Sequence, residues 1–190
     1  MNGIKFYDGS GLRPIKDLAV IFANADPPVS PVGTLDYFVV HCTATEFDRD
    51  ITGDDIRKWH MSPKSKGGRG WSRVGYSDLI RLSGQVENLV PYDEDMYVED
   101  DEMTWGVAGH NKHARHCVYA GGVIVGNNVN TLNGMQAASL ACLILRTIKY
   151  HPNIKIVGHR DIQIHTKKSC PNFDVKKFCN LLGVPKKNLL

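Results

Sequence analysis

Two histidines and a cysteine lie where a metal ion could bring distant parts of the chain together. His41 and His159 each come at the end of a short apolar run, and Cys170 follows eleven residues after His159. The runs at 38–40 and 154–157 predict buried strands. Two imidazoles and one thiolate fill three of the four positions around a tetrahedral Zn2+ ion, and an open fourth position is typical of catalytic zinc. The fold must then bring two strand ends and one loop to a single point.

Each of the three residues is ambiguous when taken alone. A single histidine is more often a buried polar residue than a metal ligand, and a single cysteine is as often a structural thiol. His159 is followed by Arg160 and Asp161, which could hold its ring in one orientation. Lys168 lies two residues before Cys170, and a nearby cation lowers the pKa of a thiol. Together the three form a chemically coherent set, which favours metal binding.

Other residues compete for the same role. His110, His113 and His116 form a cluster in a polar run, which we expect to be a solvent-exposed or substrate-lining loop rather than a set of metal ligands. His165 or Cys42 could supply a fourth protein ligand. In that case the site would be a closed, structural zinc site serving an unrelated activity.

Composition narrows the class of protein. The 190 residues carry a net charge of only +3, which does not indicate a nucleic-acid partner. Five cysteines in no paired pattern do not demand disulfides. The sequence shows neither a secretory signal nor about 18 consecutive apolar residues. We therefore expect a monomer that is cytoplasmic at synthesis, carries no export signal and does not insert into a membrane.

The apolar patterns predict an α/β fold in which a mixed central sheet is flanked by helices. We expect residues 1–34 to be an N-terminal lead-in that wraps the domain, and residues 35–190 to form one domain. Asp93–Glu102 holds seven carboxylates in ten residues and predicts a solvated loop, with cation or calcium binding as the alternative. The expected elements are strands at 38–40, 118–125 and 154–157, a hairpin of 74–82 with 85–90, and helices from Thr52, over 132–150 and over 174–182.

Four segments in consistent order resemble the zinc-dependent N-acetylmuramoyl-L-alanine amidases. This family includes phage lysozyme-type amidases and shares a fold with the peptidoglycan recognition proteins. The similarity spans about residues 35–183. The segments are Phe38-Val39-Val40-His41-Cys42-Thr43-Ala44-Thr45, Gly70-Trp71-Ser72-Arg73-Val74-Gly75-Tyr76, Gly158-His159-Arg160-Asp161 and Lys168-Ser169-Cys170-Pro171-Asn172-Phe173-Asp174.

The resemblance implies a specific site. His41, His159 and Cys170 would hold Zn2+ at the floor of a groove, and Tyr76 and Lys168 would assist catalysis. The reaction would cleave the amide bond between N-acetylmuramic acid and L-alanine in peptidoglycan, a bacteriolytic activity directed at the cell wall.

This chain departs from the family after the tyrosine. It has Ser77, Asp78 and Leu79 where many members have a histidine and an aromatic residue. The departure places a carboxylate at a position usually filled by a larger apolar side chain. We expect it to alter the groove wall and substrate choice more than the zinc chemistry.

Three functions fit these features. A phage or prophage endolysin is favoured because the motifs match phage enzymes best. A cytosolic amidase that recycles muropeptides would use the same ligands. A peptidoglycan-binding module without hydrolysis is the alternative from another class, and Cys170 argues against it because a pure binder needs no third ligand.

Overall fold

The computed structural model describes residues 5–7, 12–14, 31–163, 165 and 167–190. The chain divides into one unit of Met1–Ser30 and a second of Pro31–Leu190. In the first unit, β1 (Lys5–Tyr7) pairs antiparallel with β2 (Leu12–Pro14). The prediction that residues 1–34 wrap the domain falls mostly outside the described residues. Residues 31–34 form strand β3, which pairs antiparallel with β8 of the second unit.

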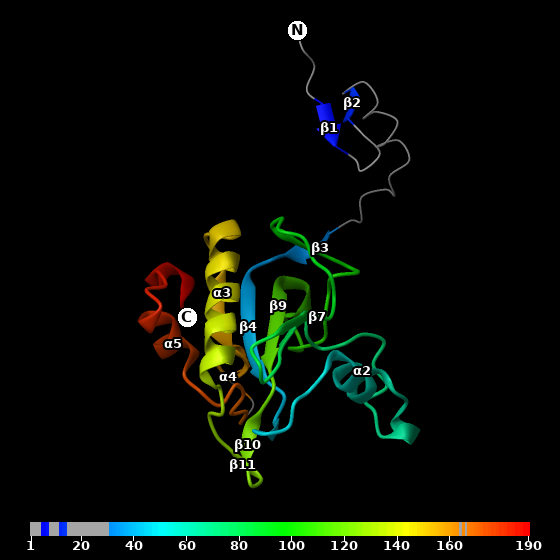
Figure 1. The fold of residues 1–190 in the computed structure, drawn as a ribbon, viewed down its shortest axis with the longest axis vertical. Coiled ribbons are helices and arrows are strands. Elements are labelled where there is room, and N and C mark those ends of the chain that lie inside the picture. The colour runs from blue at the N-terminus through cyan, green and yellow to red at the C-terminus, as the bar shows by residue number, and fades with distance from the viewer. Residues whose placement is uncertain (1–4, 8–11, 15–30, 164, 166) are drawn as a thin grey trace. The chain divides into compact units, whose positions relative to one another are not determined.

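A five-stranded mixed sheet forms the centre of the second unit. Its strand order is β12-β4-β9-β6-β7, in which the first four strands are parallel and β7 runs antiparallel to β6 (Figure 1). This confirms the predicted fold class. The strands of the unit are β3 (Pro31–Thr34), β4 (Tyr37–Cys42), β5 (Thr45–Glu46), β6 (Asp78–Ile80), β7 (Val86–Asn88), β8 (Tyr97–Glu99), β9 (Ala114–Tyr119), β10 (Gly122–Ile124), β11 (Asn127–Asn128) and β12 (Lys155–Gly158).

Helices lie on both sides of this sheet. Helices α3 (Gly134–Tyr150) and α5 (Val175–Leu181) lie on one side, and α2 (Gly53–Met61) lies on the other (Figure 1). Side chains alternate between the two faces of a strand. On β4, Phe38 and Val40 therefore join the core under α3 and α5. The remaining helical segments are α4 (His159–Ile162) and the short 3-10 turns Lys64–Lys66, Asn111–His113 and Lys186–Asn188.

Side-chain caps explain where the two longer helices begin. Thr52 accepts a hydrogen bond from the backbone N–H of Asp55, and the Asp55 carboxylate accepts one from Thr52 N–H in return. Asn133 and Gln136 form the same reciprocal capping box at α3. Both starts agree with the predicted helices to within two residues. Among the helices of the described residues, none combines the length and apolar character that crossing a bilayer requires.

The strand predicted over 118–125 is interrupted at two glycines. Gly121 and Gly122 have φ angles of +124° and +107°, a region that favours glycine. A Cβ at Gly122 would also lie 2.8 Å from Cys42 Sγ. The chain therefore leaves the central sheet at this point, and β10 pairs with β5 and β11 in a separate small sheet.

Part of the acidic segment is neutralised by basic side chains. Glu94 lies 2.8 Å from Arg146 and 3.5 Å from Arg115, and 3.4 Å from His151 Nε2. The Glu94 side chain is only 21% exposed. The prediction of a fully solvated loop is therefore wrong for Glu94, because basic residues distant in sequence gather beneath it.

Asp78 points away from the groove that the sequence analysis expected it to alter. It is paired in register with Cys117, whose side chain belongs to the core beneath α3. The Asp78 carboxylate accepts hydrogen bonds from Tyr92 OH at 2.8 Å and from Asn88 Nδ2 at 3.1 Å. Burial raises its pKa despite these donors. The expectation of an altered groove wall at Asp78 is wrong, because the strand turns this side chain to the other face.

Candidate metal centre

The fold brings His41, His159 and Cys170 together. Each offers one ligand atom, and these atoms all lie within 4.8 Å of one another. Strand β4 pairs in parallel with β12, with Val40 opposite Gly158. The residue after each of these is a histidine, so the two imidazoles emerge side by side at the same edge of the sheet, and their ring centroids are 4.6 Å apart.

Backbone contacts place the cysteine against the same edge. The N–H of Arg160 donates to the Cys170 carbonyl at 2.9 Å, and the N–H of Cys42 donates to Cys170 Sγ at 3.3 Å. The Sγ atom lies 3.8 Å from His41 Nδ1. In a tetrahedral zinc site with usual bond lengths, sulfur and nitrogen ligands are about 3.5 Å apart. The donor set and its spacing therefore fit a zinc ion.

The two imidazoles are in the protonation state that a metal needs. Burial lowers the pKa of His41 well below its usual value, and the neighbouring His116 and His159 lower it further. Burial also lowers the pKa of His159. Only a neutral imidazole can donate a lone pair to a metal, so both side chains are ready to bind at neutral pH.

The protonation of Cys170 departs from the sequence-based expectation. Lys168 does act to lower the pKa of the thiol. Its effect is outweighed by the hydrogen bond with the Cys42 side chain and by burial, which raise the pKa of Cys170 in the metal-free protein. A metal must therefore displace the thiol proton when it binds.

Gln163 and Lys168 both contact the far nitrogen of His159. Its Nε2 lies 3.0 Å from Gln163 Oε1 and 3.0 Å from Lys168 Nζ. When Nε2 carries the ring proton it donates to Gln163, and Nδ1 keeps the free lone pair that a metal requires. Lys168 can donate to Nε2 only in the other tautomer, because an ammonium group has no acceptor. The glutamine on the turn after His159 was not singled out from the sequence, although its spacing of four residues within a helical turn is a usable signal.

The histidine cluster is only partly a loop. His110 packs edge-on against Tyr37, and His113 lies near Asp36 with 43% of its side chain exposed. His116 is fully buried on β9, with its Nδ1 3.1 Å from His41 Nε2. The prediction of an exposed or substrate-lining residue is therefore wrong for His116. The strand begins at Ala114, four residues earlier than the apolar pattern indicated.

Among the described residues, only His41, His159 and Cys170 form a possible metal-binding group at this edge of the sheet, and no fourth protein ligand joins them. Neither Cys42 nor His165 belongs to it. Cys42 Sγ lies 3.6 Å from Asn172 Nδ2, on the side of β4 that faces the core. The arrangement is that of an open site, in which one coordination position is left for water or substrate.

A groove of about 370 Å³ opens at His159, which is the one candidate ligand among the residues that line it. The Tyr76 ring lies 5.1 Å from the His41 ring and 5.3 Å from that of His60. Burial raises the pKa of Tyr76, so the phenol stays protonated and can donate a hydrogen bond. The residues that line the groove include His60, Trp71, Tyr76, Trp105, His159 and Lys168.

His60 supports the segment that carries Tyr76. It lies on α2, is 6% exposed, and its Nδ1 accepts a hydrogen bond from Gly75 N–H at 3.0 Å. Burial, with a smaller effect of Arg69, lowers the pKa of His60 to about 4. A protonated Nδ1 could no longer accept this bond. Protonation of His60 in acid would therefore break the hydrogen bond that supports the groove segment at Gly75.

We expect acid to weaken the fold through His60. The folded state binds this proton only near pH 4, whereas the unfolded state binds it near 6.5. The lost stability therefore appears as pH falls below 6.5, with a slope of up to about 1.4 kcal/mol per pH unit. The His60→Asn variant keeps an acceptor for Gly75 but does not titrate. Urea unfolding between pH 7 and pH 5 should show a steeper loss in the wild type, and parallel profiles would refute the link.

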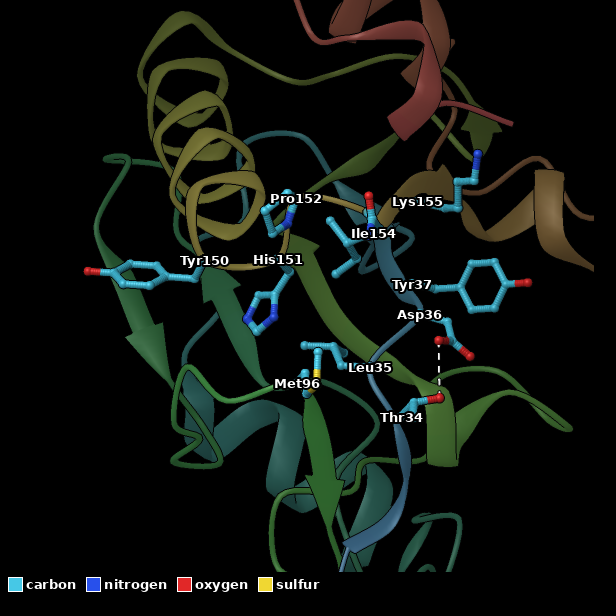
Figure 2. A pocket seen from close by; sticks show the side chains of 11 residues that line it. Thr34, Leu35, Asp36, Tyr37, Met96, Tyr150, His151, Pro152, Ile154 and Lys155 are labelled. Carbon is cyan, nitrogen blue, oxygen red and sulfur yellow. Dashed lines mark hydrogen bonds between the residues drawn. The ribbon is translucent and has the colours of Figure 1, made fainter.

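A larger hollow of about 450 Å³ lies at the opposite end of the strands. Its lining includes Tyr37 and Lys155, the first residues of β4 and β12, whereas His41 and His159 lie at the other ends of these strands. Figure 2 shows this hollow, with the hydrogen bond between Thr34 and Asp36 at one side. It is therefore separate from the metal centre.

Comparison with known proteins places these features in context. The sequence profile of a family described as N-acetylmuramoyl-L-alanine amidase matches residues 31–173. The endolysin of Enterobacteria phage K11 is 28% identical over 142 residues, which cover 74% of this chain and 83% of that protein.

Two solved structures show the same fold. The amidase LysC from Clostridium intestinale URNW has a TM-score of 0.60 at 24% identity, covering 84% of this chain and 92% of that one. The peptidoglycan recognition protein PGRP-SA of bumblebee has a TM-score of 0.57 at 17% identity, covering 87% and 92%.

Proposed function

The chain belongs to the N-acetylmuramoyl-L-alanine amidase family, and we propose that it cleaves the amide bond between N-acetylmuramic acid and L-alanine in peptidoglycan. The observation that carries this proposal is the convergence of His41, His159 and Cys170, together with the groove that His159 lines with Tyr76 and Lys168. Three protein ligands of this kind suit a catalytic zinc.

We propose Zn2+ as the metal on the chemistry of the ligands. Two neutral imidazoles and a thiolate form a borderline-soft set that suits zinc better than magnesium or calcium, which prefer oxygen ligands. When bound, zinc would lower the pKa of water to about 7 and polarise the carbonyl of the scissile amide.

The remaining work falls to side chains of the groove. Tyr76 keeps its proton at neutral pH and would donate a hydrogen bond to the oxygen that becomes negative as the amide is attacked. Lys168 would add positive charge beside the same oxygen. The Lys168 side chain is exposed, and its Nζ lies 3.0 Å from His159 Nε2, a contact that supports this role.

We propose a phage-type endolysin as the biological role. The support comes from relatives named as endolysins, which match about three quarters of this chain and more than four fifths of their own length. Such an enzyme would act on the bacterial cell wall. A muropeptide-recycling amidase with the same ligands is the second candidate within the enzyme class.

The test is digestion of purified peptidoglycan by the zinc-loaded protein. We expect new L-alanine amino termini, which appear only when the amide bond to muramic acid is cut. Binding to sacculi without new amino termini would instead establish the non-hydrolytic module. Comparing intact sacculi with small soluble muropeptides separates the two roles, because an endolysin should prefer the intact polymer.

A further inference from the structure

His116 is a buried histidine that contacts one of the three candidate ligands but is not itself one of them. It lies on β9, next to β4 in the sheet, and is fully buried. Its Nδ1 lies 3.1 Å from His41 Nε2, and the two rings meet edge to face with centroids 5.2 Å apart. The other nitrogen of the His41 ring, Nδ1, faces Cys170 Sγ at 3.8 Å.

The single proton between these two histidines decides whether His41 can bind a metal. If His116 donated the proton, His41 would carry its own proton on Nδ1 and could not ligate. If His41 donates from Nε2, its Nδ1 keeps a free lone pair directed toward Cys170. A hydrogen bond to the remote nitrogen is how proteins fix the tautomer and orientation of a ligating histidine.

Burial of the second ring nitrogen of His116 destabilises the fold. Its Nε2 is buried and, within the described part of the chain, has no hydrogen-bond partner. Leaving a buried polar group unpaired is destabilising, because the group has lost its hydrogen bonds to water without gaining others. An apolar side chain on β9 would avoid this cost, so stability alone does not account for a histidine here.

The neighbouring backbone is shaped to admit this ring. A Cβ added at Gly106 would lie 2.5 Å from His116 Cγ, 2.6 Å from its Nδ1 and 2.7 Å from Gly75 O. Real Cβ atoms do not approach other atoms so closely, so any larger residue at 106 would displace the imidazole. The absence of a side chain at Gly106 thus keeps His116 Nδ1 within reach of His41.

We propose that His116 is a positioning residue that accepts a hydrogen bond from His41 Nε2–H and thereby directs His41 Nδ1 toward the metal. This inference rests on the proposed metal site. It assigns His116 no contact with metal or substrate. The free energy of zinc binding should therefore depend on His116, although the apo fold does not.

Zinc affinity of three variants tests this role. The Zn2+ dissociation constant is measured by competition with a chromogenic chelator, alongside thermal unfolding of the apo proteins. We expect His116→Leu to weaken zinc binding roughly 10- to 100-fold without loss of apo stability. We expect His116→Asn, whose side-chain oxygen can take the place of Nδ1, to recover most of the affinity. His113→Leu, at the exposed end of the same segment, is the matched control and should bind zinc as the wild type does.

A double-mutant cycle with Gly106 provides an independent check. Gly106→Ala should weaken zinc binding because it displaces the His116 ring. Its Cβ also meets Gly75 O, so the expected result is a smaller further loss when His116 is already leucine, the part that acts through His116 being absent. In the zinc-bound wild type, long-range nitrogen–proton NMR correlations should place the His41 proton on Nε2.

The outcomes are distinguishable. Zinc binding by His116→Leu that equals the wild type overturns the positioning role and leaves the proposed function intact. A loss of affinity that follows a loss of apo stability, with no recovery in His116→Asn, shows a merely structural role. A wild type that binds no zinc contradicts the proposed metal site itself.

Discussion

Replacing Cys170 with serine is expected to abolish both zinc retention and peptidoglycan cleavage. The thiolate is the one anionic ligand in the set, and a serine hydroxyl does not ionise in its place at neutral pH. The remaining histidines, His41 and His159, leave half of a tetrahedral site unfilled by protein. We expect the metal content after dialysis to fall to background and the release of L-alanine amino termini to fall with it.

Elemental analysis and the digestion assay measure the two effects in the same preparation. Cys142→Ser is the matched control, because Cys142 is an exposed free cysteine on α3. That variant should keep the full zinc content and rate. If Cys170→Ser retained either one at the wild-type level, Cys170 would not be the third ligand.

The convergence of His41 and His159 could be predicted because each histidine lies at the end of an apolar run that indicates a strand. The apolar runs before His41 and His159 predict strands, and strands of this kind end at the edge of a sheet. The sequence does not contain the register that sets Val40 opposite Gly158. That pairing places the two imidazoles side by side, and it depends on the packing of the whole sheet.

The residues that sequence reasoning misplaced have partners far along the chain. The polar residues around His116 predict a loop, although the strand begins at Ala114. The apolar pattern does not show that His41 lies beside it on the neighbouring strand. Glu94 is similar, because its contacts with Arg115 and Arg146 form only after β9 and α3 have packed.

The pKa of Cys170 also depends on a partner that is far along the chain. The residue closest in sequence that bears charge, Lys168, predicts a lowered thiol pKa. The residue that dominates in space is Cys42, 128 positions away. The hydrogen bond between the two cysteine side chains raises the pKa of Cys170, and burial raises it further. Local sequence therefore gave the direction of one effect correctly and missed the larger one.

Tyr76→Phe is expected to separate catalysis from metal binding. The variant removes one hydroxyl, while the ring keeps its packing against His41 and His60. Zinc content should therefore match the wild type. Loss of a single donor to a developing oxyanion typically lowers kcat by roughly 10²–10³-fold, so we expect a fall of this size with little change in KM.

Steady-state kinetics on a soluble muropeptide, together with metal analysis, measures both expectations for Tyr76→Phe. Tyr97→Phe is the matched control, because Tyr97 is 40% exposed on β8 and does not line the groove. A phenylalanine variant at 76 with full kcat would exclude the phenol from catalysis. A variant that lost zinc would show instead that the hydroxyl supports the metal centre. Only retained zinc with a reduced kcat agrees with a donor that acts in the transition state, which is the role that a partly buried, protonated phenol beside His41 can perform.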